Sequence, residues 1–295
     1  MNPSVPDLQS DTTPGRLERV TSRDGLVLVA DDHGPLGAPA VVLLHGGGQT
    51  RHSWSGAARV LAQRGYRVIN FDARGHGDSE WSPAGAYSLD DRVADLEAIV
   101  RQLDQPFALV GASLGGATSI HAVALAMRPA ALVLVDIVPH PEPEGISRIV
   151  GFMRGHPNGF ATLDEAADAV AAYNPDRPRP RDPSGLLRNL RRREDGRLYW
   201  HWDPRIVASR PQDLHAIVQE SATALPQTGI PVLLVRGLKS DVVSDAGIAA
   251  FRAILPGLEV ADVGGAGHMV AGDRNDAFNS SVIAFLERHL SLRDA

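Results

Sequence analysis

"FALVGASLGGATSI", residues 107–120, is an apolar run that stops at a serine held between glycines. Ser113 is the central residue of the pattern Gly-Ala-Ser-Leu-Gly. In such a turn between a strand and a helix, the serine occupies a strained corner, and the residues two positions away must be small. The helix that follows directs its amino end at the serine and favours negative charge there. The stretch therefore predicts a strand, a sharp turn that presents Ser113, and a helix.

Short apolar runs alternate with amphipathic stretches on both sides of this turn. The pattern is typical of an α/β protein with a mostly parallel sheet covered by helices. The alternation breaks after "ALVLVDIV", where prolines and arginines interrupt helix-like pieces, and it returns with "PVLLVRG". We expect residues 1–16, which are polar and contain prolines, to be a disordered lead-in. Residues 17–138 and 226–295 should form the core, and residues 139–225 a helical insertion.

The composition sets limits on the class of protein. A chain of 295 residues with 43% hydrophobic residues and a net charge of -6 fits a globular protein and lacks the basic footprint of a nucleic-acid binder. It has no cysteine, which excludes disulfides and a cysteine nucleophile and fits the cytoplasm. We expect no membrane span, because no apolar run is long enough. No metal or cofactor is expected, since no metal-binding spacing such as H-E-x-x-H occurs.

A serine hydroxyl becomes a strong nucleophile only when a base takes its proton and an acid orients that base. The best candidate base is His268 in "GGAGHMV", on a loop after a short strand. The best candidate acid is Asp241 in "RGLKSDVVS", just beyond the strand "PVLLV". Asp136 in "LVLVDIVP" also follows a strand and is the alternative candidate for the acid. Carboxyl ends of parallel strands meet at one edge of the sheet, so these residues can assemble there.

A second glycine-rich stretch, "HGGGQT" at residues 45–50, also follows a strand. Acyl transfer needs two donors aimed at the developing oxyanion, and losing one typically costs roughly 3 kcal/mol of transition-state stabilisation. The N–H of Leu114 can supply one donor, and the N–H of Gly47 or Gly48 the other. We expect His45 and His76, in neighbouring turns, to brace these loops through hydrogen bonds.

Aromatic residues give the only indication of a substrate pocket. We expect Trp54, Trp200 and Trp202 to line a pocket for a small, hydrophobic substrate. For "YWHWDP", which contains two of these tryptophans, sealing the insertion onto the core is an equal alternative. The arginines at positions 188 and 191–193 are interpreted as a solvated face of the insertion rather than a site for an acidic substrate.

With these segments in place, the chain resembles the α/β-hydrolase fold superfamily from about Leu17 to Leu290. The stretch "FDARGHGDS" adds to the likeness. The resemblance implies an eight-stranded sheet flanked by helices, with a lid inserted after the sixth strand. The motifs "HGGG", "DARGHGDS" and "SDVVS" are similar to those of epoxide hydrolases, cofactor-free haloperoxidases, C–C bond hydrolases and small esterases. Epoxide hydrolases and haloalkane dehalogenases carry an aspartate nucleophile, and Ser113 at that position argues against both.

The sequence thus predicts a serine hydrolase that cleaves a carboxylic ester or lactone through an acyl-enzyme. Ser113 is the expected nucleophile, His268 the base and Asp241 the acid. A perhydrolase or a C–C bond hydrolase could use the same three residues, because the insertion and the pocket decide the substrate. A ligand receptor that keeps the fold is the non-enzymatic alternative. No pattern in the chain indicates the oligomeric state.

Overall fold

The computed structural model describes residues 15–175, 179–208, 211–268 and 275–292. The first 14 residues, which make up most of the predicted lead-in, lie outside this part of the chain, and the first strand begins at Arg16.

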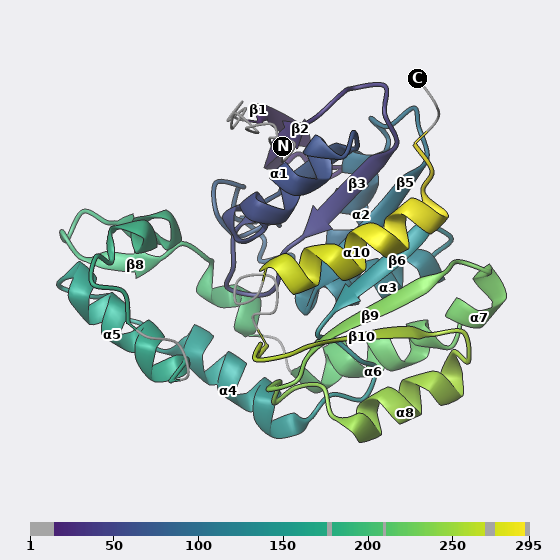
Figure 1. The fold of residues 1–295 in the computed structure, drawn as a ribbon. Helices are drawn as coiled ribbons and strands as arrows, with labels where there is room; N and C mark the ends of the chain where they lie inside the picture. Colours follow the sequence, from purple (N-terminus) through teal and green to yellow (C-terminus); the bar gives the residue numbers. More distant parts are fainter. Residues whose placement is uncertain (1–14, 176–178, 209–210, 269–274, 293–295) are drawn as a thin grey trace, which may run out of the picture.

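A single eight-stranded sheet organises the fold (Figure 1). The strand order is β1-β2-β4-β3-β5-β6-β9-β10. Strand β2 pairs antiparallel with β1 and β4, and all the other neighbours are parallel. This confirms the predicted mostly parallel sheet. The bounds are β1 Arg16–Thr21, β2 Val27–His33, β3 Ala40–Leu44, β4 Arg67–Phe71, β5 Phe107–Ala112, β6 Ala131–Val135, β9 Val232–Gly237 and β10 Glu259–Val263.

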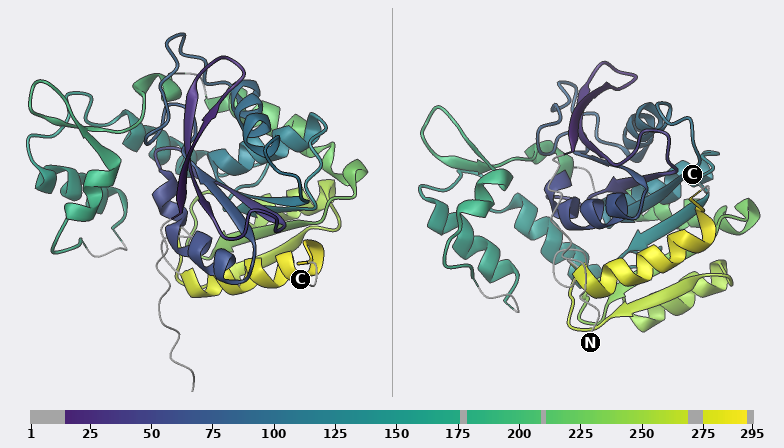
Figure 2. Two further views of the ribbon diagram at one scale, coloured as in Figure 1. Left: turned by 90° about the horizontal axis from the view of Figure 1, so that it is seen from above. Right: turned by 45° about the horizontal axis from the view of Figure 1, so that its top comes forward.

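Helices cover both faces of the sheet, as Figure 2 shows. Side chains alternate along a strand, so Val41 and Leu43 of β3 pack into one apolar cluster and Val42 and Leu44 into the other. The first cluster includes residues of α1 Ser55–Gln63 and α10 Asn275–His289. The second includes residues of α2 Leu89–Val100, α3 Leu114–Ala124, α6 Pro211–Ala222, the short α7 Leu225–Thr228 and α8 Asp245–Ile254. Strands β3 and β6 are buried throughout, as expected for parallel strands covered on both faces.

An insertion between β6 and α6 projects to one side of the sheet (Figures 1 and 2). Its described residues form two helices, two 3-10 helices and a small antiparallel sheet. The elements are α4 Pro143–Arg154, α5 Leu163–Tyr173, the 3-10 helix Ser184–Asn189, β7 Leu190–Arg192, β8 Leu198–Trp200 and the 3-10 helix Pro204–Val207. The insertion has its own apolar cluster, formed by Met153, Phe160, Ala166, Leu190, Leu198, Trp200, Trp202 and Ile206.

The predicted end of the insertion at residue 225 lies too far along the chain. Helix α6 packs against α3, and its residues Val218 and Ala222 are buried in the core cluster on that face of the sheet. The apolar side of α6 is therefore covered by the core and not by the insertion. The insertion also contains strands, so it is not purely helical.

Candidate active site

Ser113 occupies a sharp turn between β5 and α3. Its φ of 46° and ψ of -111° lie in a region that residues with a side chain rarely adopt. A Cβ on Gly111 would lie 2.5 Å from the Gly115 carbonyl oxygen, and a Cβ on Gly115 would lie 2.3 Å from the Leu44 carbonyl oxygen. Both distances are too short for any side chain. The small residues predicted on either side of Ser113 are thus a steric requirement of the turn.

His268 is paired with Asp136. Its Nδ1 lies 2.7 Å from Asp136 Oδ2. The carboxylate is fully buried, and it also accepts hydrogen bonds from Ser240 Oγ at 2.5 Å and from the Gly237 N–H at 3.3 Å. Three donors compensate for the burial of its charge. With Nδ1 donating to Asp136, Nε2 is the ring nitrogen of His268 that can take up a proton.

Asp241 does not contact His268, so its prediction as the acid is wrong. Its side chain is 32% exposed and forms an ion pair with the exposed Arg148 of α4. Asp241 lies four residues beyond β9, after a turn in which the Ser240 N–H donates to the Gly237 carbonyl. Asp136 comes directly after β6, whose neighbour β5 leads to Ser113. The alternative acid, Asp136, is therefore the one that the structure brings to His268.

The glycine-rich loop after β3 lies against the serine. A Cβ on Gly46 would lie 3.4 Å from Ser113 Cβ. The Gly48 N–H already donates to His76 Nε2 at 3.1 Å, which excludes Gly48 as an oxyanion donor in this conformation. The N–H groups of Gly47 and Leu114 have no acceptor among the described residues. Leu114 is the first residue of α3, where an N–H has no partner within the helix.

Two buried histidines hold these loops, as predicted. His45 Nδ1 lies 2.8 Å from the Gly46 carbonyl, and its Nε2 accepts from the Ala73 N–H at 2.9 Å. His76 Nδ1 lies 3.2 Å from the Arg74 carbonyl. Burial lowers the pKa of His45, and it lowers the pKa of His76 further. Both rings are therefore neutral near pH 7, which leaves one nitrogen of each ring free to accept a hydrogen bond.

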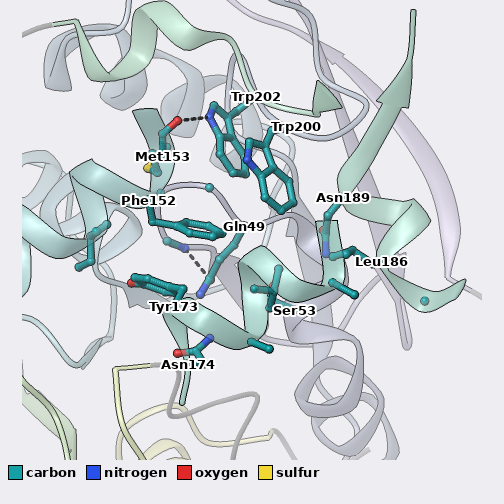
Figure 3. Close-up of a pocket in the computed structure, with 18 of the residues that line it drawn as sticks. Gln49, Ser53, Phe152, Met153, Tyr173, Asn174, Leu186, Asn189, Trp200 and Trp202 are labelled. Atoms are coloured by element: carbon teal, nitrogen blue, oxygen red, sulfur yellow. Dashed lines mark hydrogen bonds between the residues drawn. The ribbon is translucent and has the colours of Figure 1, made fainter. Parts of the chain in front are cut away.

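A cavity of about 560 Å³ lies next to Ser113 and His268, between the core and the insertion. Figure 3 shows aromatic side chains of the insertion along one wall. Trp200 and Trp202 stack with ring centroids 5.0 Å apart, and Phe152 and Tyr173 stack at 4.3 Å. Other apolar residues in the lining are Ile149, Met153, Val170 and Leu186, and polar ones are Gln49, Ser53, Asn174 and Asn189.

The three predicted pocket tryptophans have different positions. Trp200 and Trp202 line the cavity, as expected, and both also belong to the apolar cluster within the insertion itself. Trp54 does not line the cavity, and its predicted role there is wrong. Its side chain is only 1% exposed and packs in the core cluster with residues of α1 and α10. The sequence prediction missed Phe152 and Tyr173, whose only signal is their place on amphipathic helices of the insertion.

The charged groups at the cavity are paired with their own neighbours. Arg179 lies 2.6 Å from carboxylate oxygens of both Asp164 and Asp168. Asp182 accepts from the N–H and the hydroxyl of Ser184. The arginines at positions 188 and 191–193 do not line the cavity. The described lining is therefore mostly apolar, and its charged side chains already have partners.

The described residues contain neither a cluster of metal ligands nor a helix that could cross a membrane. In this part of the chain, no three His, Asp or Glu residues are grouped so that they could hold a metal ion. None of its helices has both the length and the apolar character needed to cross a bilayer.

Comparisons with known proteins agree with this fold. The family model described as "alpha/beta hydrolase fold" matches residues 39–274. Esterase Rv0045c of Mycobacterium tuberculosis is 34% identical over 217 residues, which is 70% of this chain and 69% of that protein. Mouse sn-1-specific diacylglycerol lipase ABHD11 is 31% identical over 264 residues, covering 84% and 81% of the two chains. The crystal structure of an alpha/beta hydrolase from Novosphingobium aromaticivorans superposes with a TM-score of 0.77 at 28% identity, over 93% of this chain and 98% of that one.

Proposed function

The chain belongs to the alpha/beta hydrolase fold family and is a hydrolase, and we propose that it cleaves carboxylic esters or lactones with Ser113, His268 and Asp136. The contact between His268 and Asp136, at the same cavity as Ser113, carries this proposal. Asp136 holds His268 in the tautomer with the proton on Nδ1. Nε2 then takes the proton of Ser113 as its hydroxyl attacks the substrate carbonyl.

The attack forms a tetrahedral oxyanion, which the N–H groups of Leu114 and Gly47 stabilise. His268 next gives its proton to the leaving alcohol oxygen, and an acyl-enzyme on Ser113 remains. Water then attacks the acyl carbon while His268 takes a proton from it. Collapse of the second intermediate returns that proton to Ser113 and releases the acid. With a lactone, the alcohol and the acid leave as one molecule.

The cavity favours an uncharged, apolar small-molecule substrate. Its wall includes Phe152, Tyr173, Trp200 and Trp202, and its charged residues are already paired. A carboxylate or phosphate on the substrate would lose hydration there without gaining a counter-ion. The insertion serves as the lid of the site, because it supplies most of the side chains that enclose the substrate. The similarity to an esterase and to a diacylglycerol lipase supports ester chemistry.

The test is covalent labelling of the serine. The protein is incubated with a fluorophosphonate, and its intact mass is compared with those of Ser113→Ala and of Ser53→Ala, a second serine at the same cavity. We expect one adduct on the parent and on Ser53→Ala, and none on Ser113→Ala. Hydrolysis of p-nitrophenyl esters over many turnovers should follow the same pattern and would exclude a receptor. An adduct or full activity in Ser113→Ala would refute the proposal.

A further inference from the structure

We propose that His201, which lies between the two cavity tryptophans, is a positioning residue for the oxyanion loop. Its imidazole joins the insertion to the backbone at Gly48, next to the proposed donor Gly47. The enclosure of the substrate and the stabilisation of the transition state are thereby coupled through one side chain. This inference rests on the proposed function.

His201 faces the core rather than the cavity. Residues 200–202 are all buried, but only Trp200 and Trp202 line the cavity, and His201 is 1% exposed. The ring of His201 does not line the cavity and lies on the side of the core loops that contain Gly48 and Gly77. There it contacts the core: its ring lies 5.9 Å from that of His76, measured between centroids.

Two hydrogen bonds determine the role of the ring. The Gly77 N–H donates to His201 Nδ1 at 2.7 Å. Since a backbone N–H can only donate, Nδ1 must be unprotonated and the ring proton sits on Nε2. Nε2 lies 3.3 Å from the Gly48 carbonyl and therefore donates to it. Gly48 follows β3 and Gly77 follows β4, so one ring connects the insertion to two loops of the core.

The backbone at Gly48 is held from both sides. Its N–H donates to His76, and its carbonyl accepts from His201. Gly48 has a φ of 72°, which glycine adopts freely and from which it can equally well depart. The bond to His76 holds the peptide between Gly47 and Gly48, and the bond to His201 holds the peptide between Gly48 and Gln49. Together they fix the conformation of Gly48, the residue that follows the proposed donor Gly47. A shift of about 1 Å in a catalytic group can cost roughly a hundredfold in rate, so this restraint matters for the donor.

The protonation state of His201 supports the same role. Burial lowers its pKa to about 3. The ring is therefore neutral at the pH of an ordinary esterase assay, and Nδ1 keeps the lone pair that accepts from Gly77.

Two substitutions separate the two bonds of His201. An asparagine places its amide where Nδ1 stood, so His201→Asn can keep an acceptor for Gly77 and lose the donor to Gly48. A glutamine places its amide nitrogen where Nε2 stood, so His201→Gln can keep the donor to Gly48. We expect His201→Asn to lower kcat at least tenfold with KM within about twofold, and His201→Gln to stay within about threefold of the parent kcat. His156→Asn is the matched control, because His156 is an exposed histidine of the insertion that contacts Phe160 and not the oxyanion loop.

A second measurement reports on the oxyanion donors directly. Phenylboronic acid forms a tetrahedral adduct on an activated serine, and its inhibition constant should rise in His201→Asn by about the same factor as kcat falls. Thermal unfolding and fluorophosphonate titration of active serine normalise each rate to folded, labelled protein. A purely structural role would lower stability or the active fraction, but would leave the normalised kcat and the boronate affinity unchanged.

The experiments distinguish a failure of the proposed function from a failure of the role of His201. A parent protein that neither labels nor hydrolyses esters refutes the proposed function. An active parent with an unchanged normalised kcat in His201→Asn overturns the role of His201 alone, and so does an equal loss of kcat in the asparagine and glutamine variants. If His201→Asn does not fold, His201→Gln decides by itself, because a tenfold loss of kcat in that folded variant contradicts the proposal.

Discussion

Replacing Asp136 by asparagine should inactivate the protein without unfolding it, because of how its three donors are arranged. The hydroxyl of Ser240 donates to the carboxylate and already accepts from the N–H groups of Val242 and Val243, both at 3.1 Å. An amide NH₂ in place of Oδ1 would face the Gly237 N–H, which can only donate. We therefore expect the NH₂ in place of Oδ2, the oxygen that now accepts from both Ser240 and His268. The Nδ1 of His268 then has to accept, and the ring proton moves to Nε2. In that tautomer His268 cannot take the proton of Ser113.

The expected loss of kcat in Asp136→Asn follows from this change of tautomer. A wrong tautomer in a serine triad costs about 10⁴ in kcat, equivalent to about 5.5 kcal/mol of transition-state stabilisation. Asp241→Asn is the control, since it removes only an ion pair between side chains that are 32% and 53% exposed. Such pairs contribute about 0 to 1 kcal/mol to stability, so its kcat/KM should stay within about twofold of the parent.

The assay is the initial rate of p-nitrophenyl ester hydrolysis over a range of concentrations, together with thermal unfolding of each variant. The assignment of the acid is refuted if Asp136→Asn keeps a tenth of the parent kcat/KM. It is equally refuted if Asp241→Asn, while folded, loses activity a thousandfold.

Three further predictions concern the core, pH and the cavity. Gly115→Ala should lower the free energy of unfolding by about 3 kcal/mol in urea titrations, because its Cβ would lie 2.3 Å from the rigid Leu44 carbonyl; an unchanged midpoint would contradict the steric argument. The pKa of His201 is about 3 in the folded protein and about 6.5 in the unfolded chain. The unfolded chain therefore binds more protons at acid pH. Stability should therefore fall as the pH drops below 6.5, by about 2 kcal/mol at pH 5 from this ring alone, and His201→Gln should show a correspondingly smaller fall in urea titrations at pH 7.5 and 5. Trp54→Leu should lower the free energy of unfolding by about 3 kcal/mol and leave KM unchanged, because Trp54 packs in the core. Trp200→Leu should raise KM for bulky apolar esters, because Trp200 lines the cavity. A raised KM in Trp54→Leu together with an unchanged KM in Trp200→Leu would show that the substrate does not bind in this cavity.

The sequence could predict the turn at Ser113 but not which aspartate contacts His268. The turn at Ser113 could be foreseen because glycines two residues away are a steric condition of the turn itself. The choice between Asp136 and Asp241 could not, because both follow parallel strands. It depends on which strand lies beside β5 and on how far the chain runs on before it turns, and both are properties of the assembled sheet.

The aromatic residues show the same limit. Trp54 and Trp202 both lie near glycine-rich or proline-bearing turns, yet one is buried under helices of the core and the other lines the cavity. An indole fits either environment, so only the tertiary packing distinguishes them. Helix α6 is a similar case, because its apolar stripe could have been covered by the insertion as well as by α3.

The strained backbone at Ser113 and Asp136, two members of the proposed triad, has a thermodynamic consequence. Ser113 and Asp136 both have positive φ angles, 46° and 50°, at the ends of adjacent strands. Each such residue costs about 1 to 3 kcal/mol, a considerable share of the 5 to 15 kcal/mol that typically separates a folded domain from its unfolded chain. Glycine at position 113 would relieve that strain and remove the nucleophile in the same change. Directed evolution for heat resistance alone would therefore reward inactive variants, and a thermostable form of this protein has to be selected for turnover at every round.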